Sequence, residues 1–328
     1  MTIKPPKKPE WLRVKVPSDR SSFETIQKIR QNALCTVCVE AQCPNQMECF
    51  NRGTATFMLL GPVCTRNCAF CAVEKGRVAA PDPREPFLVA EAISELGLKY
   101  CVLTMVTRDD LNDGGAFHIE RTVKTIRTKT PEINIELLIS DLSGSGGALT
   151  KVLQTKPAVL NHNIETVERL YPKVRPQAIY ARSLSLLAEV AKTSPSTTTK
   201  SGMMLGLGET RKEIIATMSD LRSAGCQVLT MGQYLAPSKK HLPVAKYIDP
   251  QEFDAYREEA LRLGFVGVAS GPLVRSSYRA EELYAQAIRH QEETRENNNL
   301  NRKPNCTKML HISDNAQPFR DASQGVHE

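Results

Sequence analysis

Two cysteine triplets between residues 38 and 71 constrain this chain more than any other feature. The first consists of Cys38, Cys43 and Cys49, and the second consists of Cys64, Cys68 and Cys71. A cubane 4Fe-4S cluster has four irons, and each iron takes one ligand from outside the cluster. Three thiolates leave one iron open, and an open iron can do chemistry as well as carry electrons. The spacing therefore predicts two 4Fe-4S clusters, one on each triplet.

Structural zinc is the competing interpretation of these triplets. Zinc normally takes four protein ligands, most often as two close pairs. No histidine lies near either triplet, and three thiols are one ligand short of a closed zinc site. The triplet spacing therefore favours clusters over zinc.

Composition excludes the secreted and membrane-spanning classes from the expected functions. Ten cysteines suggest disulfides only in an exported chain, and residues 1–9 contain no apolar signal segment. No run of eighteen apolar residues is present to span a bilayer. We therefore expect reduced thiols in an iron-loaded compartment, the cytoplasm, and no membrane partner.

The formal net charge of +7 is concentrated in part at the N-terminal end. Residues 1–16 hold five basic side chains and a single acidic one, Glu10. Such an arm either steers the protein toward an acidic partner or only keeps the segment soluble. Nucleic acid is not the expected partner, because no groove-reading motif or aromatic–basic platform is present.

Short apolar segments alternate with helical patterns from Thr56 onward. The expected strands are residues 56–60, 100–106, 133–139, 158–161, 201–205, 227–231 and 265–269. Four apolar helical faces lie between them, and one opens with a capping box at Thr210 and Glu213. This pattern predicts an α/β fold with a buried parallel sheet, and six such units suit a partial (β/α)6 barrel of the TIM type. The alternation alone is equally compatible with an open doubly wound sheet.

Three regions follow from this pattern. Residues 1–55 are predicted to hold an arm, a helix and the first triplet, and residues 56–280 the barrel. Residues 281–328 are predicted to form a final helix and a disordered polar tail. Because sites in such folds gather beyond the carboxyl ends of the strands, Cys64 falls where a catalytic loop is expected.

Several long phrases carry a resemblance to a known family. The second triplet, residues 64–71 (CTRNCAFC), resembles the motif of radical S-adenosylmethionine (SAM) enzymes. The other phrases are 11–15 (WLRVK), 43–45 (CPN), 54–58 (TATFM), 108–115 (RDDLNDGG), 161–166 (NHNIET), 200–209 (KSGMMLGLGE) and 275–280 (RSSYRA). Together, in this order, they are similar to the lipoyl synthase family, a radical SAM family whose barrel would account for residues 56–280.

The resemblance implies a set of site residues. The Cys64 triplet would bind the cluster that cleaves SAM, and Ser277 would complete the auxiliary cluster on the Cys38 triplet. Cys35, which lies outside the family triplet, is interpreted as a bystander. No side chain is expected to act as an acid–base catalyst, because saturated C–H bonds offer no proton for such a group to move.

Four further residues are candidates for SAM contacts. Phe70 and Ala72 flank Cys71 and would place backbone groups against the methionyl moiety, or they serve only loop packing. Asn163 and Asp109 would bind polar groups of the cofactor, or they serve only local turns.

The implied reaction inserts two sulfur atoms, at C6 and C8, into an octanoyl chain on a lysine of a lipoyl carrier protein. That carrier would be the lipoyl domain of a 2-oxoacid dehydrogenase E2 or a glycine cleavage H protein. The auxiliary cluster would donate the sulfur, a ferredoxin or flavodoxin the electrons, and an iron–sulfur carrier would rebuild the cluster. Two alternatives are another dual-cluster radical enzyme that inserts sulfur elsewhere and a metal-stabilised nucleic-acid-binding module.

Overall fold

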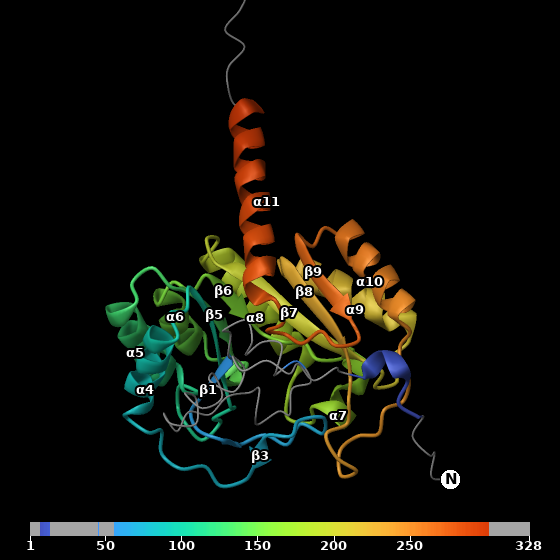
Figure 1. Cartoon of the computed structure of the whole chain (residues 1–328), viewed down its shortest axis with the longest axis horizontal. Helices are drawn as coiled ribbons and strands as arrows, with labels where there is room; N and C mark the ends of the chain where they lie inside the picture. The colour runs from blue at the N-terminus through green and yellow to red at the C-terminus, as the bar shows by residue number, and fades with distance from the viewer. Residues whose placement is uncertain (1–6, 14–44, 46–55, 302–328) are drawn as a thin grey trace, which may run out of the picture. The chain divides into compact units, whose positions relative to one another are not determined.

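Seven parallel strands, hydrogen-bonded in the order β1-β4-β5-β6-β7-β8-β9, form the main sheet of the computed structural model (Figure 1). The structure describes residues 7–13, 45 and 56–301. The strands are Thr56–Leu59 (β1), Tyr100–Met105 (β4), Asn134–Leu138 (β5), Val159–Asn161 (β6), Thr198–Leu205 (β7), Val228–Gln233 (β8) and Gly267–Gly271 (β9). The predicted α/β class is confirmed. Because the spatial order follows the chain without reversing, the sheet is barrel-like rather than doubly wound.

A helix follows each strand of this sheet before the chain returns to the next one. The helices are α4 (Glu85–Glu95), α5 (Ala116–Lys129), α6 (Gly146–Gln154), α7 (Tyr171–Val174), α8 (Tyr180–Thr193), α9 (Arg211–Ser223), α10 (Pro250–Arg262) and α11 (Ala280–Asn301). Short 3-10 turns are η1 (Glu10–Leu12), η2 (Leu142–Gly144) and η3 (Glu168–Leu170). Figure 1 shows α4, α5 and α6 beside the first strands of the sheet and α9 and α10 beside the last. None of the described helices is both long and apolar enough to cross a membrane.

The chain divides into two compact units, residues 1–290 and residues 291–328. The first unit contains the whole sheet and the first turns of α11. The first cysteine triplet and the helix predicted before it lie outside the described residues. The division into regions 1–55, 56–280 and 281–328 therefore stays a prediction.

Local signals in the sequence explain how the helices begin and end. The predicted capping box is confirmed: the Thr210 hydroxyl accepts the Glu213 N–H, and the Glu213 carboxylate accepts the Thr210 N–H at 2.8 Å. Two residues beyond α4, Gly97 adopts a φ of +61°, a left-handed conformation that ends the helix at low cost.

The helices bury their predicted apolar faces against the outer side of the sheet. One cluster joins Ile93 of α4 and Ile126 of α5 to the first strands, and a second joins Met218 of α9 and Phe253 of α10 to β7 and β8. Burial of these side chains is the main driving force for the fold, at roughly 1.5–3 kcal/mol for each large aliphatic residue.

The inner face of the sheet carries a buried polar layer. Lys200 of β7 lies 2.8 Å from the Glu136 carboxylate of β5, and their side chains are 1% and 0% exposed. Tyr100 and Asn161 donate further hydrogen bonds to the same carboxylate, at 2.8 and 2.9 Å. These partners compensate much of the cost of burying the charges. Alternate residues of a strand share a face, so Glu136 lies on the same face as Leu138, and Lys200 lies on the same face as Gly202. Leu138 and Gly202 line the cavity described next, and the polar layer lies directly beneath them.

Candidate functional site

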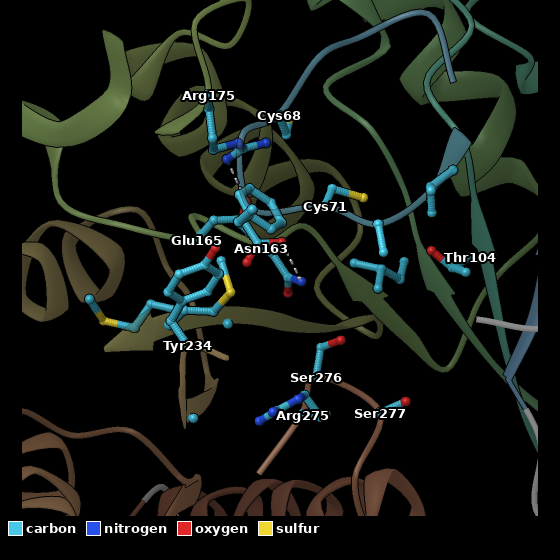
Figure 2. A pocket seen from close by; sticks show the side chains of 18 of the residues that line it. Cys68, Cys71, Thr104, Asn163, Glu165, Arg175, Tyr234, Arg275, Ser276 and Ser277 are labelled. Atoms are coloured by element: carbon cyan, nitrogen blue, oxygen red, sulfur yellow. Dashed lines mark hydrogen bonds between the residues drawn. The ribbon is translucent and has the colours of Figure 1, made fainter. Parts of the chain in front are cut away.

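A cavity of about 530 Å³ opens at the carboxyl ends of the strands, where sites gather in barrels of this type. Its lining comes from segments far apart in the chain, including Met58 of β1, Thr104 of β4 and Tyr234 directly after β8. Figure 2 shows the side chains of Cys68, Cys71 and Asn163 around one space, with Ser276 and Ser277 below. Most of the lining is apolar, and a few polar groups converge within it.

The second triplet forms one wall of this cavity. Its loop is anchored by a small parallel pair of strands, β2 (Val63–Cys64) and β3 (Glu74–Lys75). The thiols of Cys64, Cys68 and Cys71 all belong to the cavity lining. Among the residues that the structure describes, no three His, Cys, Asp or Glu side chains converge closely enough to hold a single metal ion. Burial raises the pKa of Cys68 and raises that of Cys71 to about 11.

A buried arginine ties this loop to two neighbouring strands. The Arg66 guanidinium donates to Asp109, in the loop after β4, at 2.7 and 2.8 Å, and to Asp141, after β5, at 2.7 Å. Burial favours the neutral form of Asp141, but the hydrogen bond and the charge of Arg66, with smaller contributions from His162 and the Ser143 N–H, together outweigh burial and lower the pKa of that carboxyl. The backbone N–H of Arg66 also donates to Sγ of Cys64 at 3.4 Å. Anchoring Arg66 therefore fixes the backbone that contacts the first thiol.

The turn that leads from β1 to the triplet has a second anchor. Leu60 and Gly61 adopt φ values of +71° and +86°, which are strained for the leucine. The Glu85 carboxylate accepts both backbone N–H groups, at 2.8 and 3.3 Å, and lies 2.6 Å from Nε2 of His118. The hydrogen bonds hold the turn in this conformation, and His118 in turn holds the Glu85 carboxylate.

A polar group of three side chains, Asn163, Glu165 and Arg175, also lines the cavity, and Figure 2 shows Arg175 beside Cys68. Asn163 donates to the Glu165 carboxylate at 3.0 Å, and Arg175 donates to the Asn163 carbonyl at 3.0 Å. Glu165 has a φ of +66°, and burial raises its pKa. Two buried atoms, Oδ1 of Asn163 and Nε of Arg175, have no hydrogen-bond partner among the described residues. Buried polar atoms are normally paired, so this wall has spare capacity for a polar ligand.

The predicted site residues are brought together in part. The cavity lining includes Phe70, Ala72, Asn163 and Ser277. Asp109 is not part of the lining, because its carboxylate is engaged by Arg66 and by the Ser143 hydroxyl, which donates at 2.8 Å. Cys38, Cys43 and Cys49 lie outside the described residues.

Sequence reasoning missed Arg66, Glu165 and Arg175. Arg66 lies inside the triplet and Glu165 inside the phrase 161–166, so both were close to recognised signals. Arg175 lies in a short turn before Pro176, and nothing local distinguishes it from a surface arginine. Its contacts with the residue-163 segment arise only in the folded chain.

The chemistry of the cavity fits a three-thiolate cluster with SAM on its open iron. Three cysteines line one cavity, and the same lining offers a guanidinium, a carboxylate and an unpaired amide oxygen. SAM carries amino, carboxylate and hydroxyl groups that such side chains bind, and the apolar remainder of the lining keeps water out.

A hydrogen bond joins Asn45, near the first cysteine triplet in the sequence, to the segment that carries Ser277. The side chain of Asn45, which is buried, donates to the carbonyl oxygen of Leu273 at 2.6 Å. Asn45 follows Cys43 by two residues, and Leu273 precedes Ser277 by four. Asn45 is therefore held against the segment that carries Ser277.

Comparison with known proteins gives consistent results. Residues 58–221 match the family model described as the Radical SAM superfamily. Over 282 residues the chain is 53% identical to the lipoyl synthase of Alkaliphilus metalliredigens, which covers 86% of this chain and 97% of that protein. Over 280 residues it is 54% identical to the lipoyl synthase of Desulfotalea psychrophila, with coverages of 85% and 94%.

Solved structures support the fold. HydG, a maturase of the FeFe hydrogenase, superposes with a TM-score of 0.52 at 16% identity over 77% of this chain and 63% of its own. SuiB of Streptococcus suis bound to S-adenosylmethionine gives 0.52 at 10% identity over 78% of this chain and 56% of its own. This chain thus spans less than two thirds of either structure, and at these identities the likeness concerns the barrel alone.

Proposed function

This chain belongs to the lipoyl synthase family, and on that premise we propose that it inserts two sulfur atoms into an octanoyl chain on a lysine of a lipoyl carrier protein. The sulfur atoms enter at C6 and C8, and the enzyme uses SAM and two 4Fe-4S clusters. The observation that carries this proposal is that the thiols of Cys64, Cys68 and Cys71 line the same cavity as Asn163 and Ser277.

The second triplet is the proposed ligand set of the cluster that binds SAM. Together, bound cluster and SAM supply a radical that removes hydrogen from an unactivated C–H bond, which no side chain can do alone. Arg66 holds the loop in position through Asp109 and Asp141, so the three thiols keep one orientation toward the cavity. Asp109 thereby supports the site through Arg66.

The polar group of Asn163, Glu165 and Arg175 is the proposed SAM pocket. Arg175 and Glu165 present opposite charges there, and the unpaired Oδ1 of Asn163 accepts a hydroxyl or ammonium hydrogen. Phe70 and Ala72 flank the last thiol and close the pocket around the methionyl end. These groups bind and orient the cofactor, while the buried layer of Lys200 and Glu136 closes the floor.

The auxiliary cluster is proposed to bind Cys38, Cys43 and Cys49 together with the Ser277 hydroxyl. Two observations support this set. Ser277 lines the cavity, and Asn45 is hydrogen-bonded to Leu273, which lies in the segment that precedes Ser277. An oxygen ligand is a weaker partner for iron than a thiolate, so it leaves more readily when the cluster gives up sulfide.

We place the reaction in the cytoplasm. The acyl-bearing partner is the lipoyl domain of a 2-oxoacid dehydrogenase E2 or the glycine cleavage H protein. A ferredoxin or flavodoxin supplies electrons, and an iron–sulfur carrier rebuilds the auxiliary cluster after each turnover.

The test is an anaerobic assay of the reconstituted enzyme with an octanoyl-lysine peptide, SAM and dithionite. Mass spectrometry should detect a peptide that has gained two sulfur atoms, and iron analysis should give about eight irons per chain. Cleavage of SAM without any thiolated peptide, from fully loaded enzyme, would instead favour another dual-cluster radical enzyme. A zinc-only protein after reconstitution would contradict both.

A further inference from the structure

Four exposed lysines lie in segments that are hydrogen-bonded to the loop carrying the second triplet. They are Lys75, Lys173, Lys239 and Lys240, and we call them the lysine rim. They come from three separate segments, residues 72–78, 171–177 and 235–248. Each of the three segments is hydrogen-bonded to the triplet loop, so the fold gathers these charges at one place.

Each contact involves a ligand residue or its neighbour. The Lys75 ammonium donates to the carbonyl oxygen of Cys68 at 3.1 Å. Beside Lys173, the Val174 carbonyl accepts the Ala69 N–H at 2.9 Å. After Lys240, the His241 imidazole lies 3.1 Å from the carbonyl oxygen of Cys71.

Nothing in these segments neutralises the rim. Glu74 is the one carboxylate within residues 72–78, 171–177 and 235–248. None of the four lysines forms an ion pair with another residue in the part of the chain that the structure describes. Lysines elsewhere on the surface do have partners, such as Lys124 with Glu120 at 2.6 Å.

We propose that the lysine rim is the docking surface for a small acidic one-electron donor protein. This inference rests on the proposed function, because it assumes that the Cys64 triplet holds the SAM-cleaving cluster. One electron passes from the donor, which is oxidised, to the cluster, which is reduced, and no atom or proton is transferred. The class of partner is set by charge: an anionic face around the donor's redox centre complements the rim.

The position of the rim favours an electron donor over other acidic partners. Electron transfer needs a donor close to the cluster, whereas contact with the reacting carbon is unnecessary. The Lys75 ammonium donates a hydrogen bond to the backbone carbonyl of Cys68, and the side chain of Cys68 carries one of the proposed ligand sulfurs. Steering by such a patch raises association rates by roughly ten- to a thousandfold and weakens as salt screens it.

The test compares two double variants of the loaded enzyme, using flavodoxin as the probe. The rim variant is Lys239→Glu with Lys240→Glu, since the hydrogen bonds to the carbonyl oxygens of Cys68 and Cys71 come from Lys75 and His241 instead. The matched control is Lys99→Glu with Lys192→Glu. Both lysines are exposed: Lys99 directly precedes β4, and Lys192 lies in the last turn of α8, which leads into β7, so both are toward the amino ends of the strands, away from the cavity. Affinity for oxidised flavodoxin is measured by titration calorimetry at low and high salt. SAM cleavage is then measured with reduced flavodoxin and, separately, with dithionite.

We expect the rim variant to bind flavodoxin about tenfold more weakly at low salt and to lose most of its salt dependence. Flavodoxin-driven SAM cleavage should fall in proportion, while dithionite-driven cleavage stays unchanged. The control should match the wild type in every measurement. Equal loss in both variants, or no loss in the rim variant, would overturn the proposal.

Two further outcomes separate this inference from the proposed function. If flavodoxin binding is unchanged but the KM for the octanoylated carrier rises under dithionite, the rim serves the carrier and the proposal is wrong. If wild-type enzyme cleaves no SAM with dithionite, the proposed function fails, and the calorimetry alone still decides whether the rim binds the donor.

Discussion

The Arg66 guanidinium and the Asp141 carboxylate form an ion pair 2.7 Å apart whose side chains are only 6% and 1% exposed. One residue belongs to the triplet loop and the other to the loop after β5. A buried pair of this kind fixes the loop in one position, and loss of one partner leaves the other charge uncompensated.

Arg66→Met is therefore expected to destabilise the fold and the cluster together. The free energy of unfolding should fall by about 3 kcal/mol, because Asp141 loses its closest cation. Urea unfolding and iron analysis measure the two effects. Arg84→Met, which breaks an exposed Arg–Asp pair, is the control and should change little. Identical unfolding curves for the two variants would contradict the anchoring role.

Cys68→Ala should remove the SAM-cleaving cluster and leave the auxiliary cluster in place. Iron should drop from about eight to about four per chain, and 5′-deoxyadenosine should no longer form. Cys226→Ala is the control, since Cys226 is buried in the core away from the cavity lining. Retention of deoxyadenosine formation by Cys68→Ala would rule out the triplet as the ligand set.

Cys43→Ala should separate the two halves of the reaction. Cleavage of SAM is expected to persist in part, because the Cys64 triplet is intact. Insertion of sulfur should stop, because the donor cluster is incomplete. Deoxyadenosine is followed by chromatography and thiolated peptide by mass spectrometry, and any thiolated product from this variant would refute the donor assignment.

Ser277→Ala and Ser276→Ala form a matched pair, since both side chains line the cavity. We expect only Ser277→Ala to weaken the auxiliary cluster, with at least about a tenfold loss of sulfur insertion and faster iron release to a chelator. Ser276→Ala should resemble the wild type. The reverse result would move the ligand to Ser276.

The neutral imidazole of His162 should make stability depend on pH. Its ring nitrogens lie 2.9 Å from the Ile139 carbonyl oxygen and 2.9 Å from the Ser183 hydroxyl. Burial, and then the nearby charge of Arg175, lower its pKa from 6.5 to about 4. Between these values the unfolded chain binds the proton and the folded chain does not. The stabilisation is thus complete above pH 6.5 and is lost as the pH falls toward 4, by about 3 kcal/mol in total.

His162→Asn keeps a hydrogen-bond donor near Ile139 but cannot titrate. Urea unfolding of the cluster-free chain at several pH values should show a shallower decline between pH 6.5 and 4 than the wild type. An unchanged slope would show that other groups cause the acid sensitivity.

The strands and helices were largely predictable, and the exceptions have a physical cause. Strand β7 begins at Thr198, three residues before the predicted start, because Thr198 and Lys200 are polar yet buried. Hydrophobic patterning cannot detect a buried lysine whose partner, Glu136, lies 64 residues away. The capping box at Thr210 was predictable because both of its hydrogen bonds join residues three apart.

The residues of the candidate site also differ in whether the sequence alone could reveal them. The second triplet was recognisable because its three ligands lie within one turn-forming loop. Glu165 and Arg175 were not recognised, because their significance comes from lining the same cavity as that loop in the folded chain. The lysine rim likewise gathers segments that are about 100 and 165 residues from the triplet. They are joined to it by the hydrogen bond from the Ala69 N–H to the Val174 carbonyl and by the contact of the His241 imidazole with the Cys71 carbonyl.

The amino-acid sequence by itself determined the cluster-binding chemistry, the family and the β/α alternation, since each depends on spacing within a short stretch of chain. Tertiary structure alone decided that the sheet winds in one direction, that Arg66 joins three loops and that the segments of the four rim lysines are hydrogen-bonded to the triplet loop. The reason is that pairwise contacts between distant segments depend on how the whole sheet curves, and no local pattern of side chains encodes that geometry.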